Sequence, residues 1–208
     1  YPLGAEKQII QTVTGREVPP GGSPLHVKCA VFNVATVFAI HDALFQGWPL
    51  THRAVTVTGG AVTRPRNLWV PIGTPLRSLL EACGGLREAS DRMLTGGPMM
   101  GVALQNLDAP VTKDTNSLVC LTDWEHKPET PAGVCIRCGK CVAACPMHLP
   151  PTFIRRALEE HDVEKLAKYH LEDCNSCGCC SFICPAQIPL VEAVSLARAV
   201  LRREGVGK

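Results

Sequence analysis

The chain has 208 residues, 46% of them apolar, which is enough to bury a core and argues against a disordered protein. Its formal net charge is only +2, with acidic and basic residues interspersed, so the basic surface that binds nucleic acid is not expected. No apolar run approaches the roughly 20 residues that cross a bilayer. The N-terminus also lacks a signal-peptide pattern, so a cytoplasmic protein is expected.

The middle of the chain is rich in glycine and proline and carries short β-branched runs, a pattern typical of a small sheet. AVTVTGGAV (54–62) predicts a hairpin that turns at Gly59 and its neighbouring glycine, and LWVPIG (68–73) predicts a further strand. TPLRSLLEACGG (74–85) predicts a helix with Thr74 as its N-cap. Together these elements indicate a β-grasp arrangement.

TGGPMMG (95–101) is interpreted as a tight turn whose Met99 and Met100 fill gaps in the core. Alternatively, its glycines could let the backbone approach a ligand closely. The histidines are scattered without ligand spacing. Outside the C-terminal region three cysteines are expected to be buried small apolar side chains: Cys29, Cys83 and Cys120.

The C-terminal third concentrates the chemistry, because nine of the 12 cysteines lie between Cys135 and Cys184. Two runs share the spacing CxxCxxCxxxCP, the bacterial ferredoxin pattern, in which the fourth cysteine binds the cluster of the other run. Two [4Fe–4S] clusters are therefore predicted. The predicted ligands are Cys135, Cys138, Cys141 and Cys184 for one cluster, and Cys174, Cys177, Cys180 and Cys145 for the other.

One cysteine of this region, Cys179, falls outside the shared register. It is interpreted as a small residue packed beside a cluster, with a redox or persulfide role as the alternative. Structural zinc is the competing interpretation of the whole region, because the two leading CxxC pairs could supply four ligands. Zinc would leave five cysteines of this region without a role and would not account for the proline after each run.

Helices are predicted around and after the cysteine runs. Between the runs, residues 151–173 have apolar positions at helical spacing in two short stretches, with Pro151 at the first helix start and Asp162 as the second cap. A further amphipathic helix is predicted over residues 190–203, after Pro189. This helix content resembles the helical ferredoxin modules of respiratory reductases.

Several stretches together resemble one family over nearly the whole chain. In order, the sequence contains YPLGAEKQII, TGREVPPGG, NVATVFAIHDALFQGWPL, VTVTGGAV, GGPMMG, PVTKDTNSLV and CIRCGKCVAACP. This ordered set resembles the C subunit of the Rnf electron-transport complex. The cobalamin reductase of propanediol microcompartments shares much of it and is the nearest alternative. The resemblance implies an α+β chain with three parts: a tail of a flavoprotein-like α/β domain (1–50), a soluble-ligand-binding β-grasp domain (51–122) and a helical double-cluster ferredoxin domain (123–208).

The resemblance also implies a partial cofactor pocket near the N-terminus. Gly4, Glu6 and Lys7 match the family's GxEK element near the nicotinamide, and Asn33 and Thr36 match a pair near the flavin. From the residues alone, Glu6 and Lys7 could equally be a solvated pair at a helix start, and Asn33 a helix cap. The family's glycine-rich loop for FMN and NADH is not found in the sequence, so this chain is not expected to hold those cofactors by itself.

The expected function is that of an electron-transfer component, which relays single electrons through the two clusters between a nicotinamide–flavin site and other carriers. No nucleophile–base pair points to a complete enzyme. The resemblance implies as partners the other subunits of a membrane electron-transport complex and soluble or membrane electron carriers, with the chain at the inner face of the cell membrane. The alternatives are a corrinoid reductase and a non-catalytic docking module whose clusters are structural or redox-sensing.

Overall fold

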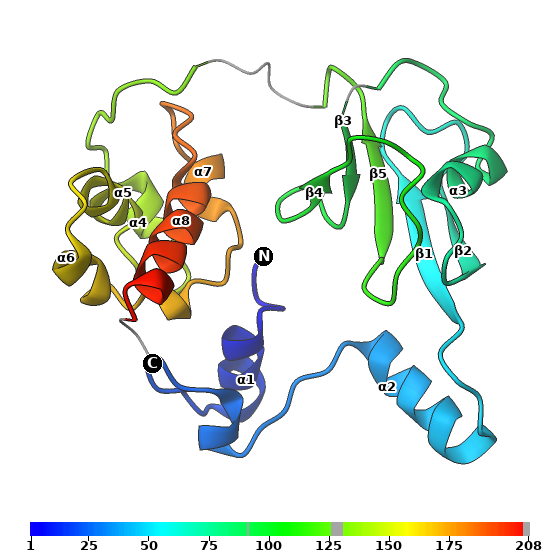
Figure 1. Ribbon diagram of the computed structural model, residues 1–208, viewed down its shortest axis with the longest axis horizontal. Coiled ribbons are helices and arrows are strands. Elements are labelled where there is room, and N and C mark those ends of the chain that lie inside the picture. The colour runs from blue at the N-terminus through cyan, green and yellow to red at the C-terminus, as the bar shows by residue number, and fades with distance from the viewer. Residues whose placement is uncertain (91, 126–130, 206–208) are drawn as a thin grey trace. The chain divides into compact units, whose positions relative to one another are not determined.

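The computed structural model describes residues 1–90, 92–125 and 131–205 (Figure 1). These residues form two compact units. The cysteine unit consists of the described residues of Tyr1–Val31 and Thr130–Lys208, and the sheet unit of those of Phe32–Glu129. Residues 1–50 are thus divided between the two units. None of the described helices combines the length and the apolar character needed to span a bilayer.

The sheet unit is built on a five-stranded sheet in the order β2-β1-β5-β3-β4 (Figure 1). Its strands are β1 (His52–Thr58), β2 (Arg66–Pro71), β3 (Arg92–Thr95), β4 (Val102–Ala103) and β5 (Ser117–Leu121). Strands β1 and β5 run parallel at the centre, and the other neighbours are antiparallel. Helix α3 (Leu76–Ala82) buries Leu76, Leu79 and Leu80 in one core with β1 and β5. This topology is the β-grasp arrangement that the sequence predicts.

Two local predictions for this unit were wrong. Residues 54–62 do not form a hairpin, because β1 pairs with β2 and Val62 makes only an isolated bridge to Leu86. The chain leaves β1 at Gly59, where a side chain would collide with the Cys120 backbone of β5. Thr74 does not cap α3; its hydroxyl donates to the Pro71 carbonyl at 2.9 Å, and Pro75 is the N-cap residue.

The turn predicted at residues 95–101 is confirmed, since it joins β3 to β4. Met100, however, is 56% exposed and does not fill the core. Cys83 and Cys120 are fully buried, as expected, and burial raises the pKa of the Cys120 thiol to about 11. Cys29 is only half-buried, so that expectation was wrong.

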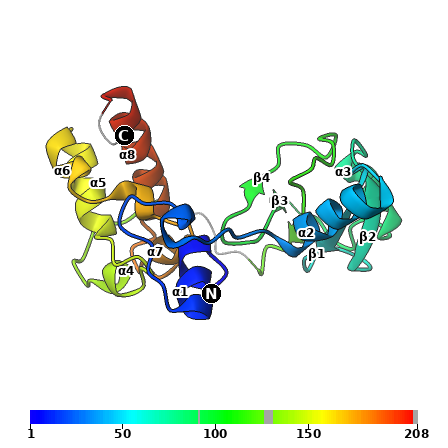
Figure 2. The ribbon, with the colours of Figure 1, turned by 90° about the horizontal axis from the view of Figure 1, so that it is seen from below.

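All regular secondary structure in the described residues of the cysteine unit is helical. Its helices are α1 (Glu6–Thr14), η1 (Pro24–Val27), α4 (Lys140–Ala143), α5 (Pro151–Glu159), α6 (Val163–Ala167), η3 (Leu171–Asp173), α7 (Cys179–Phe182) and α8 (Leu190–Arg203). The predicted starts of α5 and α8 are confirmed, and Asp162 caps α6 by accepting from the Lys165 amide at 2.9 Å. Helices α5, α6 and α8 lie side by side around a core that includes Ile154, Leu166 and Ala197 (Figure 2). With the sheet unit, this confirms the expected α+β class.

Candidate metal centres

The two cysteine runs fold in the same way, 39 residues apart. Each run leads through a loop into a short helix, α4 or α7, and then past its proline into a long helix, α5 or α8. Left-handed backbone occurs at equivalent places in both: Arg137 and Ser176, Gly139 and Gly178, His148 and Gln187. Non-glycine residues adopt this conformation only where the surrounding structure holds them there, so the repeat is a specified backbone shape.

The structure brings each predicted set of four cysteines together around its own cavity. The first cysteine site is a cavity of about 800 Å³ lined by Cys135, Cys138, Cys141 and Cys184. The second cysteine site is a smaller cavity lined by Cys145, Cys174, Cys177 and Cys180. In both, three cysteines come from one run and the fourth from the other, so the crossing that the ferredoxin spacing predicts is present in the fold.

The second site suits a cationic group that binds thiolates. Burial raises the pKa of Cys145, and the neighbouring Cys174 and Cys177 raise it further. Burial likewise raises the pKa of Cys180 to about 11, with additional repulsion from Cys174 and Cys145. Thiolates gathered in an apolar cavity repel one another, and iron ions would offset that repulsion. The donor set therefore fits an iron–sulfur cluster.

Backbone amides already point at two of these sulfurs. The Leu149 amide donates to Cys145 Sγ at 3.3 Å, and the Ser176 amide donates to Cys174 Sγ at 3.4 Å. The Ser176 contact comes from one of the left-handed positions of the repeat. Hydrogen bonds to sulfur are among the factors that set the reduction potential of a cluster, so these amides would tune the bound group.

The distances between the cysteine sulfurs do not match those of a tetrahedral zinc site with four cysteine ligands. With Zn–S bonds of about 2.3 Å, four thiolates in a tetrahedron lie roughly 3.8 Å apart. In the described part of the chain, no three cysteine sulfurs lie within 4.8 Å of one another. The one described group whose ligand atoms do converge within 4.8 Å is His170, Glu172 and Asp173. A cubane keeps its thiolates further apart than a single zinc ion does, so it does not require such close convergence.

Cys179 has a defined place in this repeat. It is the first residue of α7, where the other run has Lys140 as the first residue of α4. Burial raises the pKa of Cys179, with a hydrogen bond to Cys177 as the next cause. It lines the second site beside the four cysteines of the register. The repeat therefore supports packing next to a cluster, and the alternative redox or persulfide role of Cys179 stays a prediction.

The N-terminal segment, defined here as residues 1–21, contacts the loops that line the second site. Lys7, on α1, forms an ion pair with the carboxylate of Asp173, which is only 7% exposed and precedes Cys174. The Gly21 amide donates to the same carboxylate at 3.0 Å. The Tyr1 hydroxyl donates to the Cys177 carbonyl at 2.6 Å. Asp173 thus takes both contacts from a segment more than 150 residues away in sequence.

Gln8 and Arg198 also contact the loops that line the second site. The Gln8 side chain accepts from the Asn175 amide group at 2.6 Å and donates to the Pro146 carbonyl at 3.4 Å. Arg198, on α8, donates to the Leu171 carbonyl at 2.7 Å and also to the Cys174 carbonyl. Sequence reasoning gave neither residue a role, because each acts on a loop that is distant in sequence.

The residues matched to the nicotinamide and flavin elements fall in different units. Gly4, Glu6 and Lys7 lie at the start of α1 in the cysteine unit, with Glu6 exposed. Lys7 is not part of a solvated pair, since it is committed to Asp173. In the sheet unit, Asn33 caps helix α2 (Val34–His41), and its side chain accepts from the Ala35 amide at 2.9 Å, as the alternative interpretation expected. Contact of these residues, or of Thr36, with a cofactor stays a prediction.

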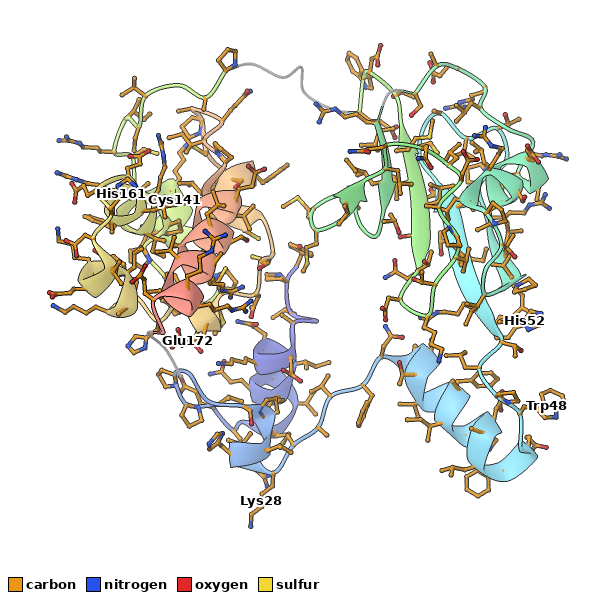
Figure 3. All side chains as sticks on the ribbon, in the orientation of Figure 1. Lys28, Trp48, His52, Cys141, His161 and Glu172 are labelled. Atoms are coloured by element: carbon orange, nitrogen blue, oxygen red, sulfur yellow. The ribbon has the colours of Figure 1, made fainter. Side chains whose placement is uncertain are left out.

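Helix α2 and the π-helical turn η2 (Asp42–Gln46) carry apolar side chains that the sheet unit does not cover. The large exposed ones are Val34, Val37, Phe38, Ile40, Leu44 and Phe45. Trp48 follows them and projects outward (Figure 3). Asn33 and Thr36 therefore belong to an element whose apolar face has no partner within the described residues.

Three family models match successive parts of the chain. Residues 1–42 match the Nuo51 FMN-binding domain, residues 54–103 match the SLBB domain, and residues 134–188 match the 4Fe-4S dicluster domain. The dicluster match covers both cysteine runs, so the expectation of iron–sulfur clusters is confirmed. The first match includes both α1 and α2, and it fits the FMN that the resemblance implies for the family.

Close relatives match nearly the full chain. The C subunit of the ion-translocating oxidoreductase complex of Rhodobacter capsulatus is 44% identical over 201 residues, 97% of this chain and 38% of the relative. The C subunit of the Na(+)-translocating ferredoxin:NAD(+) oxidoreductase complex of Acetobacterium woodii is 41% identical over 208 residues, 99% of this chain and 47% of the relative. Its counterpart in the proton-translocating complex of Clostridium ljungdahlii is 44% identical over 175 residues, 83% of this chain and 38% of the relative. The chain thus spans less than half the length of these relatives. Over nearly all of its own length, it is a homologue of the C subunits of Rnf-type ion-translocating oxidoreductase complexes, as the ordered motifs predicted.

Proposed function

We propose that the chain is the iron–sulfur electron-transfer part of a C subunit in an Rnf-type NADH:ferredoxin oxidoreductase. Two [4Fe–4S] clusters, when bound, supply one-electron redox chemistry. The observation that carries the proposal is the pair of cysteine cavities, each lined by three cysteines of one run and one of the other. The names of the relatives, which are subunits of ion-translocating complexes, support the same interpretation.

The proposed ligands are the two cysteine sets that line these cavities. Cys141 of the first site and Cys180 of the second are buried in one small apolar cluster with Ile188 and Leu190. A shared wall of this kind keeps two bound groups close, and it excludes water from the space between them. The protein therefore contributes spacing, burial and hydrogen bonds to sulfur, which are the factors that set the potential of such a group.

The remaining parts are proposed to connect this relay to its partners. On this proposal, residues 1–50 are the tail of a flavoprotein-like domain, residues 51–122 are a soluble-ligand-binding β-grasp domain, and residues 123–208 are the ferredoxin domain. Flavin and nicotinamide chemistry would require protein groups beyond those described here. The proposed partners are the other subunits of a membrane complex and one-electron carriers, with the chain attached peripherally at the inner face of the membrane.

The test is the metal content of the 208-residue chain after anaerobic purification and reconstitution. About eight irons and eight labile sulfides per chain, with spin-coupled paramagnetic resonance signals from two reduced cubanes, are expected. The signals should return after repeated cycles of reduction and oxidation. About one zinc with no labile sulfide would overturn the proposal and leave a zinc-stabilised interaction module.

A further inference from the structure

We infer that the N-terminal segment clamps the second cysteine site, and that the two sites of the relay therefore exchange electrons with different partners. The second site is then the inner end, which faces the FMN-binding part of the protein. The first site is the outer end, which exchanges electrons with an external carrier. This inference rests on the proposed two-cluster relay. It adds the order of the two clusters along the relay and names Lys7 and Asp173 as the residue pair that fixes this order.

The contacts of the segment converge on the second site. Tyr1 reaches the Cys177 carbonyl, Lys7 reaches Asp173 beside Cys174, and Gln8 reaches the loop after Cys145. They therefore touch both loops that carry the second set of cysteines. Within the described residues, the segment makes no hydrogen bond or ion pair with Cys135–Cys141, the loop of the first site.

The buried carboxylate of Asp173 shows that this docking is specific. A buried charge is costly unless it is paired and hydrogen-bonded. Both the cation and the backbone donor of Asp173 come from the N-terminal segment, through Lys7 and Gly21. Removing the segment would take away both of these partners from a carboxylate that lies next to a cysteine of the second site.

The sequence of the N-terminal segment indicates which of the two sites exchanges electrons with a flavin. Residues 1–42 match an FMN-binding domain, and α1 is the part of that match that packs in the cysteine unit. The element that holds the loops of the second site therefore belongs to the part of the chain that matches the FMN-binding domain. Because electron transfer between bound groups weakens steeply with distance, the cluster under this element is the one placed to exchange electrons with a flavin.

The first site is open by comparison. Cys138 is exposed, whereas Cys177, its equivalent in the second run, is buried. The larger cavity is also lined by Arg137 and Lys140, which form no ion pair within the described residues, while Arg155 and Arg156 nearby are paired with glutamates. This opening suits an external carrier, and the two cations favour one with an acidic face.

The first experiment compares Lys7→Met with Lys140→Met in the reconstituted 208-residue chain. Single-site variants Cys177→Ser and Cys138→Ser identify which paramagnetic resonance signal belongs to which site. At a fixed solution potential, Lys7→Met is expected to lower the reduced-to-oxidised ratio of the second-site signal about tenfold, which corresponds to about 59 mV for a one-electron couple. The reason is that an unpaired Asp173 carboxylate opposes the added electron. Lys140→Met should shift only the first-site signal.

The matched control tests whether a second substitution, at Asp173, reverses the shift that Lys7→Met causes. Asp173→Asn added to Lys7→Met removes the unpaired carboxylate and is expected to restore the second-site ratio. Asp173→Asn alone should raise the reduced-to-oxidised ratio of the second-site signal above that of the unsubstituted chain. A Lys7→Met protein with both signals intact and neither shifted, or both shifted equally, would overturn the clamp. Absence of cubane signals from the unsubstituted chain would instead overturn the proposed relay, so the two failures are distinguishable.

The second experiment follows the order in which iron is lost to a bulky anionic chelator. In the unsubstituted chain, the first-site signal is expected to decay several-fold faster than the second-site signal, because the clamp holds the loops of the second site and the first site is more open. Lys7→Met should speed decay of the second-site signal and leave the first unchanged. Equal decay in the unsubstituted chain, or faster decay of the second-site signal, would overturn the assignment of inner and outer ends.

Discussion

Cys141 and Cys180 occupy equivalent positions in the two cysteine runs, and both are buried in one apolar cluster with Ile188 and Leu190. Cys141 lies on α4 (Figure 3), and Cys180 lies on α7. Each lines a different cavity. The short helices of the repeat therefore meet at its centre, and the packing between the two sites can be tested independently of the ligands.

Leu190→Ala is expected to weaken both sites together. Leu190 is fully buried in the cluster that contains Cys141 and Cys180, and truncating such a residue costs about 2–5 kcal/mol of unfolding free energy. Denaturant unfolding and the rate of iron release from each site are the measurements. Leu196→Ala, on the exposed face of the same helix, should change neither. A Leu190→Ala protein that loses iron from one site alone would contradict a shared wall.

Cys179→Ala is expected to keep all eight irons, whereas Cys177→Ala should lose about four. The reason is positional, since Cys179 stands where the other run has Lys140, and Cys177 stands where it has Cys138. The measurement is the iron and labile-sulfide content of both variants after identical reconstitution. Loss of half the iron in Cys179→Ala would mean that the register of the second run is wrong.

Arg198→Met is expected to loosen the loop that precedes the second site. The guanidinium donates to the Leu171 and Cys174 carbonyls, and hydrogen bonds from a charged donor contribute about 1.5–3 kcal/mol. We expect the unfolding free energy of the cysteine unit, measured with denaturant, to fall by that amount. Iron should also be released faster from the second site than from the first. Arg202→Met removes an exposed arginine from the same helix and serves as the control. Equal effects of the two substitutions would rule out the specific contact.

Glu125 makes the stability of the sheet unit depend on pH. Its carboxylate accepts from the Thr122 amide at 3.0 Å and the Gly60 amide at 2.8 Å, and these bonds lower its pKa. A carboxyl with a lowered folded pKa stabilises the fold above its usual pKa of about 4.3, and that contribution disappears as pH falls through the folded value. Glu125→Gln should therefore lower the melting temperature at neutral pH and flatten its decline in acid.

The control for this prediction is Glu88→Gln, which changes an exposed carboxylate that lies 3.9 Å from the Arg87 guanidinium. Melting of the sheet unit is followed by circular dichroism across the acid range. The control should keep the pH dependence of the unsubstituted protein. A Glu125→Gln protein with the same pH dependence would show that the two backbone bonds to this carboxylate contribute nothing in solution.

Gly59→Ala is expected to unfold the sheet unit and leave the iron content unchanged. Gly59 has a φ of 112°, and a Cβ there would collide with the Cys120 carbonyl group. Gly73→Ala is the matched control, because Gly73 has a φ of 96° but open space around its Cβ position. That control should cost only the conformational penalty, about 1 kcal/mol. A folded sheet unit in Gly59→Ala would contradict the close approach of β1 and β5.

Local patterns predicted the helices around the cysteine runs well. Asp162 as a cap and the helix after Pro189 depend on neighbouring residues alone, so the sequence contains the whole signal. Strand pairing depends on distant residues, and the double glycine at Gly59 marks a close approach to β5, although it is also a hairpin signal. For the same reason the pairing of Lys7 with Asp173 has no local signature.

The crossed cysteine sets have a consequence for biosynthesis. Each cavity draws on both runs, and the first site needs Cys184, the last cysteine of the second run. Until translation has passed the second run, neither set of four is complete. If these cysteines are the ligands, cluster insertion must wait until both runs have left the ribosome, and the thiols of the first run must stay reduced throughout that interval.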